Sequence, residues 1–406
     1  MLEEPGSKYI THITPDAGDA ATICRTICDY FDSTNDNRLT ELAIVGCDAT
    51  VLNTGAENGV RCLDLKLQRP LQWSICLLHY NELPLKHLIQ KIDGRANGPE
   101  GLTGPIGKKL KNCEENKIIS FAAVEVSHDI EITEPEKLSH DQKYLYDSFY
   151  AIKSGQCPEN LVHRSPETIN LSRWLTTANR ILRYYMSEPK PSSNLKLLVN
   201  YIMNIYIPFW FLVKKHHSIN DGARHMFTFI KLTRYLDKKY LDIIDPVISR
   251  NCYFAHPENI LLSMLSDSRR DLRVLAVNKI IQARQSNDNT SIRKFSVPKL
   301  NFQAAHYTDM VDLNTVNITS TPILSNLSSV DLELSIDNER WEFFDYPSHT
   351  QAVERTVKLV TDASNTVYGY ENRHAYIKTT PESRKQLPKN NSKKDLQKFV
   401  NSISDD

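Results

Sequence analysis

The chain has 406 residues, of which 40% are hydrophobic and 24% are charged, as in a globular protein with two or three core-forming units. Lysine plus arginine equals aspartate plus glutamate at 49 each, so no overall positive charge attracts nucleic acid, and any contact with DNA must come from local patches. The N-terminal residues lack the basic and apolar segments of a secretory signal, and the eight cysteines form no paired C-x-x-C sets, so we expect an intracellular protein with free thiols.

The first hundred residues alternate between strand-like and helix-like patterns. Residues 8–14 alternate as in a strand, and residues 20–31 carry apolar side chains every three or four positions, as in a helix. An apolar run over 42–45, bounded by a polar turn, is typical of a buried strand. The remaining elements that we expect are a short helix, an apolar strand and an amphipathic segment, at 59–67, 73–78 and 83–92. This alternation predicts an α/β unit.

Asp48 follows the apolar run at 42–45 after Gly46 and Cys47. An aspartate at the carboxyl end of a strand in an open α/β sheet lies where ligands and metal ions bind. The same position also suits an aspartate that caps its own turn through the backbone. Asp48 is therefore either a site residue or a turn cap.

Residues 93–107 are rich in glycine and proline but lack the G-x-x-x-x-G-K-[ST] spacing of a phosphate-binding loop, so we expect a structured linker. From there to about 285 the pattern is helical, including a helix that begins after Asn170. The segment 195–213 is long enough to cross a bilayer, but it contains Lys196, two asparagines and a proline. We therefore interpret it as a buried core helix, and expect no membrane association.

The last third of the chain is more polar. Residues 314–337 are rich in serine, threonine and asparagine and predict loop or short strand. A helix is expected over 350–360, with Thr350 as its N-cap and three valines on one face. Residues 384–398 carry six basic residues and one acid, which indicates a solvated tail able to touch phosphates weakly.

Three motifs lie close together in the first part of the chain: Asp48 followed by Asn53-Thr54-Gly55, the RPLQW run at 69–73, and the CLLHYNELPL run at 76–85. Together they resemble a family of transposase-derived animal proteins that is itself similar to hAT-type transposases. In hAT enzymes an aspartate ends a core strand of a ribonuclease-H-like domain, and a C-x-x-H pair follows downstream. An R-W motif then lies in an inserted helical domain, and a Glu-Arg pair near the C-terminus supplies the last metal-binding carboxylate. The residues that match these four features are, in order, Asp48, Cys76 with His79, Arg173-Trp174, and Glu354-Arg355.

The resemblance implies a helix-rich α+β fold, with an incomplete ribonuclease-H-like α/β core and a large all-helical insertion. No counterpart of the first catalytic aspartate is found upstream of Lys8, so we expect an N-terminally truncated core. The expected parts are a partial core, a helical insertion, a loop-rich connector, a C-terminal helix returning to the core, and a basic disordered tail, at 1–110, 111–285, 286–340, 341–385 and 386–406.

The resemblance also assigns roles to single residues. Asp48 and Glu354 would be the catalytic and metal-binding carboxylates, holding Mg²⁺ if the protein is active, with their carboxyl groups within roughly 8 Å of each other. Cys76 and His79 would be structural. The residues expected to bind DNA are Arg173, Trp174 and Arg355, together with the lysine cluster Lys108, Lys109 and Lys111. Trp174 also lies on an apolar helical face, so a core tryptophan is the alternative.

We therefore expect a transposase-derived nuclear protein that is catalytically inactive, because one metal-binding carboxylate is missing, and that binds DNA weakly and without sequence specificity. Self-association is a further expectation. Two alternatives stay open: an active Mg²⁺-dependent strand-transfer enzyme or nuclease, if a first aspartate is encoded upstream, and a protein-interaction module.

Overall fold

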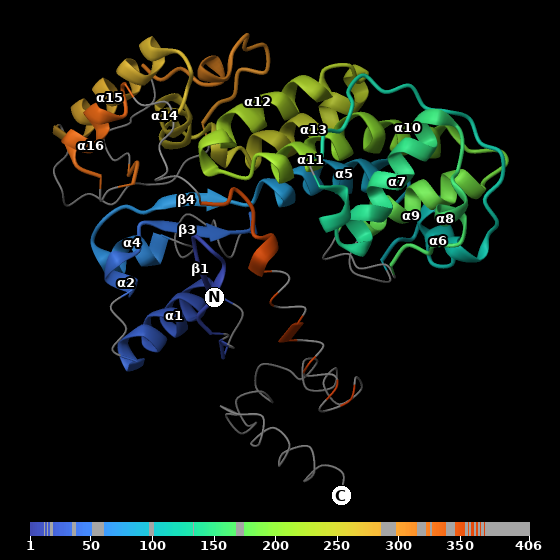
Figure 1. The fold of residues 1–406 in the computed structure, drawn as a ribbon, viewed down its shortest axis with the longest axis horizontal. Helices are drawn as coiled ribbons and strands as arrows, with labels where there is room; N and C mark the ends of the chain where they lie inside the picture. The colour runs from blue at the N-terminus through green and yellow to red at the C-terminus, as the bar shows by residue number, and fades with distance from the viewer. Residues whose placement is uncertain are drawn as a thin grey trace, which may run out of the picture. The chain divides into compact units, whose positions relative to one another are not determined.

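The structure is a computed structural model of the chain (Figure 1). It describes residues 1–11, 13, 15–16, 19–34, 38–50, 61–96, 101–132, 134–167, 174–285, 298–314, 322–324, 327–337, 346–353, 356, 359–360, 363, 366 and 369. The chain divides into two compact units. Unit 1 comprises Met1–Trp73, Asp288–Lys294 and Thr350–Asp406, and unit 2 comprises Ser74–Asn287 and Phe295–His349.

Unit 1 begins with a short hairpin and a helix. Strand β1 (Leu2–Glu3) pairs antiparallel with β2 (Lys8–Tyr9). The strand expected over 8–14 is thus limited to two exposed residues in the described part, because this hairpin has no face to bury. Helix α1 (Ala20–Thr34) confirms the helix expected there. Its buried side chains are spaced four and three residues apart, at Cys24, Cys28 and Phe31.

A second two-stranded sheet contains the strand that precedes Asp48. After α2 (Arg38–Glu41), strand β3 (Ile44–Cys47) neighbours β4 (Gln72–Ile75), and α4 (Arg61–Leu67) lies between them in the chain. A strand–helix–strand connection of this kind is typical of α/β folds. The Asp64 carboxylate, which is buried, accepts a hydrogen bond from the Leu71 N–H at 3.0 Å and so orders the turn into β4.

Unit 2 is helical. Its described elements are α5 (Leu77–Ile92), α6 (Pro105–Leu110), η1 (Cys113–Glu115), η2 (Pro135–Lys137), α7 (His140–Ser154), α8 (Glu159–Val162), α9 (Trp174–Ser187), α10 (Ser193–Tyr201), η3 (Ile202–Tyr206), α11 (Ile207–Lys215), η4 (Ile219–Asp221), α12 (Gly222–Thr233), α13 (Lys238–Arg250), η5 (Tyr253–Ala255), α14 (Pro257–Leu265), α15 (Arg270–Gln285), η6 (Tyr307–Asp309) and α16 (Ser329–Leu334). No strand occurs between 174 and 285, all of which is described. The fold is thus helix-rich α+β, with two small sheets in the described part of the chain.

The boundary between the units differs from the sequence expectation. It falls after Trp73, within β4, whereas the sequence placed the end of the α/β part near 110. Helix α5 packs against α13, α11 and α10, so it belongs to the helical unit. The strand expected over 73–78 is also too long, because the Cys76 side chain caps α5 and the helix begins at Leu77.

The apolar segment interpreted as a core helix is buried inside unit 2. Residues Ser193–Lys215 form one continuous helix that is long and apolar enough to cross a membrane, yet most of it is buried in the fold. The middle turn, η3, is π-helical, just before Pro208, which lacks an N–H. The Asn81 side chain donates to the Tyr206 carbonyl at 2.9 Å, so α5 provides a partner for a carbonyl of this irregular turn.

Two other expectations are wrong. The polar region 314–337 contains a helix, α16, because Ser328 and Asp331 form a reciprocal capping box at its start. Not every cysteine is a free thiol either, since Cys24 is disulfide-bonded. The spacing of cysteines along the sequence does not show which thiols the fold brings together. The cysteines described as free are 28, 47, 76, 113, 157 and 252.

The C-terminal helix expected over 350–360 is described at some of its positions. Residues 351–353, 356, 359 and 360 are helical, and the Thr356 hydroxyl donates to the Ala352 carbonyl at 3.1 Å. The expected basic tail lies outside the described residues.

Candidate functional site

Asp48 follows β3 directly and is half-buried. Its Oδ1 accepts a hydrogen bond from the Thr50 N–H at 3.0 Å, which is the turn-capping geometry of the two alternatives considered for this residue. Glu354 and Arg355 lie outside the described residues. The expected short distance between the Asp48 and Glu354 carboxyl groups therefore stays a prediction.

Cys76 and His79 meet at the first turn of α5. The Cys76 sulfur accepts a hydrogen bond from the His79 main-chain N–H at 3.5 Å, and His79 Nδ1 lies 3.6 Å from Glu82 Oε2. Cys76 is only 1% exposed. These contacts hold a helix start in place, which fits a structural role for the pair.

Trp174 is the first residue of α9, and its side chain is 4% exposed. Arg173 lies outside the described residues. In this geometry the indole belongs to the core of unit 2, and stacking on an unpaired base would require the start of α9 to open.

Three lysines expected to bind DNA are exposed on one short, well-anchored element. Lys108 and Lys109 lie on α6, and Lys111 directly follows it. The Asp93 carboxylate accepts hydrogen bonds from the N–H groups of Ile106 and Gly107 at 2.8 and 2.7 Å, so it caps the start of α6. We call Lys108, Lys109 and Lys111 the α6 lysine cluster.

Arg180 on α9 anchors the far end of α6. Its guanidinium, only 1% exposed, donates to the Leu110 and Lys111 carbonyls, both at 2.6 Å, and also pairs with Glu114. The lysine cluster is therefore presented on a rigid support. The sequence pattern gave no sign of this role for Arg180, because its partners lie far from it along the chain.

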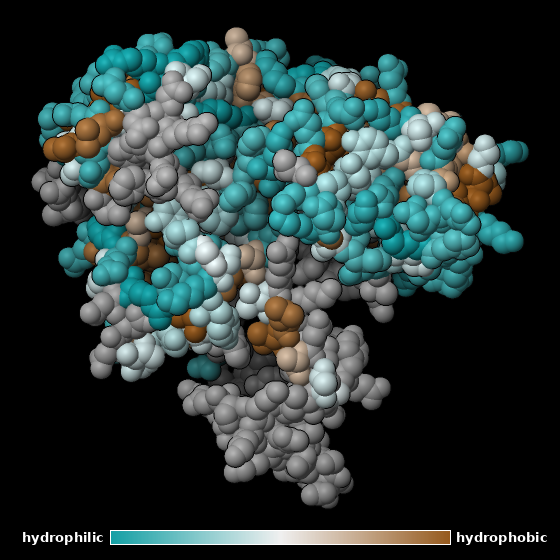
Figure 2. All heavy atoms as spheres, viewed as in Figure 1, coloured by the Kyte–Doolittle hydropathy of each residue, from teal (hydrophilic) through white to brown (hydrophobic). Residues whose placement is uncertain are grey.

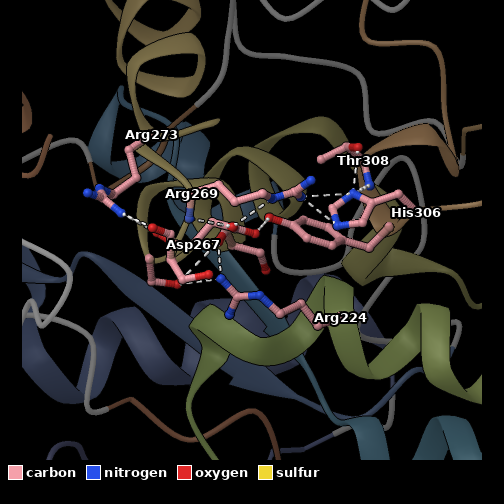
Figure 3. Close-up of polar contacts among 10 residues, drawn as sticks. Arg224, Asp267, Arg269, Arg273, His306 and Thr308 are labelled. Carbon is pink, nitrogen blue, oxygen red and sulfur yellow. Dashed lines mark hydrogen bonds and ion pairs between the residues drawn. The ribbon is translucent and has the colours of Figure 1, made fainter. Parts of the chain in front are cut away.

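A second polar network, which the sequence did not indicate, surrounds Asp267 between α14 and α15 (Figure 3). The Tyr307 hydroxyl donates to Asp267 Oδ2 at 2.7 Å, and the Arg269 N–H and Nε donate to Oδ1 at 3.0 and 3.2 Å. Burial alone would raise the pKa of Asp267, but these hydrogen bonds outweigh it and hold the pKa below its ordinary value.

The arginines of this network are satisfied by protein groups. Arg224 donates to Asp221 and to the Ser266 hydroxyl at 2.8 and 3.1 Å, and Arg273 donates to the Ile336 carbonyl at 2.8 Å. Figure 3 shows Arg224, Arg273 and His306 converging from α12, α15 and the segment around η6. The network fastens three parts of unit 2 together, so we interpret it as structural.

The protonation state of His306 follows from its partner. Arg269 Nη2 lies 2.6 Å from His306 Nε2 and, because a guanidinium only donates, Nε2 must accept. Burial and the positive charge of Arg269 lower the pKa of His306. His306 is therefore neutral in this contact, with Nδ1 lying 2.8 Å from the Thr308 hydroxyl.

One group of side chains in the described part of the chain has the composition and spacing to hold a metal ion, and it does not include Asp48. His140, Asp141 and Glu167 each place a ligand atom within 4.8 Å of the others. No sequence pattern marks these residues, because Glu167 lies 26 positions beyond Asp141 and only the packing of α7 against α9 brings the two together.

Comparisons of the chain with protein-family models, with curated proteins and with solved structures find no match.

Proposed function

We propose that the chain is a transposase-derived nuclear protein of the hAT type, with an incomplete ribonuclease-H-like core that does not catalyse strand transfer and a helical unit that contacts DNA weakly. The observation that carries the proposal is the order of the structural elements along the chain, which is the order that the resemblance to hAT transposases implies. Asp48 follows β3, β4 leads into the Cys76–His79 turn of α5, and helices continue to residue 285. Residues from Thr350 onward then group with Met1–Trp73 in unit 1, as a returning C-terminal helix would.

Two observations support the absence of catalysis. One Asp48 oxygen is engaged by the Thr50 N–H, and a carboxylate that caps its own turn is less available to a metal ion. Trp174 is buried at the start of α9 and so is not presented to a DNA end. Two-metal strand transfer needs several carboxylates converging on the ions, and the group of three potential metal ligands in the described part of the chain does not include Asp48.

DNA contact is assigned to the α6 lysine cluster and the basic C-terminal tail. Exposed lysines bind phosphates by charge and release counterions, so such binding is independent of sequence and weakens steeply as salt rises. The formal net charge of the chain is zero, so a local cluster has to supply this attraction.

The test is fluorescence anisotropy of a labelled duplex with the full chain and with two matched charge reversals. Lys108→Glu/Lys109→Glu should weaken binding at least tenfold at low salt and flatten its salt dependence. Lys238→Glu/Lys239→Glu, a pair of lysines that are also exposed, at the start of α13, should change binding by less than threefold. Equal effects of the two pairs, or binding that does not respond to salt, would refute the assignment to α6.

A protein-interaction module is the second candidate, and one surface favours it. Val330 and Leu334, four residues apart on α16, are each 64% exposed, and Leu275 on the neighbouring α15 is also exposed. Figure 2 shows hydrophobic surface in this region, at the upper left. A shift from monomer to dimer in sedimentation velocity, abolished by Val330→Glu/Leu334→Glu, would favour self-association through this face.

A further inference from the structure

The start of α7 and the segment before α9 bring together three potential metal ligands of two chemical kinds. His140 and Asp141 are the first two residues of α7, and Glu167 lies in the segment after α8. His140 Nδ1 and Glu167 Oε1 are 4.0 Å apart, and one ligand atom of each of the three residues lies within 4.8 Å of the other two. We propose that these side chains bind one divalent transition-metal ion of the zinc class.

The ligand types select the metal. An imidazole nitrogen with two carboxylate oxygens suits zinc and similar ions, whereas Mg²⁺ prefers oxygen ligands and keeps much of its water. Zinc binds such atoms at roughly 2.0–2.2 Å, which places neighbouring ligand atoms about 3.4 Å apart in a tetrahedral site. His140 and Glu167 are both partly exposed, so their side chains can close this difference by small rotations.

Two neighbouring residues of α9 fix the backbone beneath the carboxylates. The Asn179 side chain donates to the Asp141 carbonyl at 3.0 Å, and the Arg180 guanidinium donates to the Glu167 carbonyl at 2.8 Å. At the helix start, the Ser139 N–H donates to the Gln142 side chain at 3.1 Å. The backbone positions of Asp141 and Glu167 are therefore set before any ion binds, which reduces the entropy lost on binding.

The buried amide of Asn179 places an unsatisfied oxygen beside this group of ligands. Asn179 is fully buried, and its Oδ1 has no hydrogen-bond partner among the described residues, although its Nδ2 lies 3.4 Å from Asp141 Oδ1. An unsatisfied buried oxygen is costly, and the amide faces the same carboxylate that would bind the ion.

The ion would have three protein ligands and so leave a coordination position open. In zinc sites of this kind the fourth position takes water or an oxygen of a bound molecule. The site would also join the start of α7 to the segment that leads toward α9, and so stabilise the part of unit 2 that contains Trp174.

The experiment is competition of the full chain with a chromogenic chelator for Zn²⁺, comparing wild type with His140→Ala and Glu167→Gln. Each variant should lose one equivalent of bound Zn²⁺ or bind it at least tenfold more weakly, while His163→Ala, which removes an exposed histidine of the same unit, should not. Comparing these variants distinguishes zinc bound at this site from zinc bound by other histidines and cysteines of the chain.

A second readout keeps the test independent of side effects on folding. Zn²⁺ should raise the melting temperature of wild type and of His163→Ala, and should raise that of His140→Ala and Glu167→Gln much less. Mg²⁺ at the same concentration should have little effect. Equal zinc stoichiometry and equal thermal shifts in all four proteins would overturn the proposal, and so would a response to Mg²⁺ as large as that to Zn²⁺.

Discussion

The main-chain N–H of His79 donates a hydrogen bond to the thiol sulfur of Cys76, 3.5 Å away, at the start of α5. The Cys76 side chain thus caps the N-terminus of α5 through the main chain of His79, the other residue matched to the C-x-x-H motif. Cys76→Ala should lower the free energy of unfolding by about 1 kcal/mol, as the loss of other N-caps does, and should leave the number of bound Zn²⁺ ions unchanged. Urea denaturation and zinc titration of the same variant measure both effects. A loss of one zinc equivalent would instead make Cys76 a metal ligand.

Arg180 is a buried cation whose loss should strongly destabilise unit 2. Its guanidinium donates to the Leu110, Lys111 and Glu167 carbonyls, and removing it leaves these groups without their partner. Arg180→Met should destabilise the protein by about 3–5 kcal/mol, as expected when one partner of a buried pair is removed. The control is Arg270→Met at an exposed position, which should change stability by less than about 0.5 kcal/mol. Similar urea midpoints for the two variants would contradict this.

His225 on α12 should make the fold sensitive to acid. Burial lowers the pKa of His225 to about 4, below the ordinary 6.5. The unfolded chain therefore takes up this proton first as the pH falls, so the stabilising contribution is complete above pH 6.5 and is lost progressively toward pH 4. The loss should approach about 3 kcal/mol, the free-energy equivalent of this shift.

The measurement for His225 is the unfolding free energy between pH 7.5 and 4.5 for wild type, His225→Leu and His163→Leu. The His225 variant should show a flatter decline than wild type, because the buried titrating group is gone. The His163 variant, altered at an exposed position, should follow the wild-type curve. Parallel curves for all three proteins would show that His225 does not titrate as its burial implies.

The elements that the sequence predicts well are those whose signal is local. Helix α1 and the long helix Ser193–Lys215 have apolar side chains at helical spacing, and both are formed as expected. Strand and helix ends are less well predicted. The apolar run at 73–78 contains both the end of β4 and the start of α5, and only the capping contact of Cys76 shows where one gives way to the other.

The candidate sites depend on contacts between distant parts of the chain, so the sequence shows less of them. The exposed lysines of α6 can be recognised as a charge cluster, but their anchor, Arg180, lies some seventy residues further on. Asp141 and Glu167 carry no recognisable motif, and they meet only because α9 holds both backbones. Trp174 fitted either a core or a DNA-binding role by sequence, and its burial in the structure favours the core.

The most direct test of the proposed function is a cleavage and joining assay of the full chain with duplex and single-stranded DNA, in Mg²⁺ and in Mn²⁺. We expect no metal-dependent cleavage or joining, together with DNA binding that weakens steeply as salt is raised. Cleavage that Asp48→Ala or Glu354→Ala abolishes, while Lys108→Glu/Lys109→Glu affects only DNA affinity, would show an active strand-transfer enzyme and contradict this expectation.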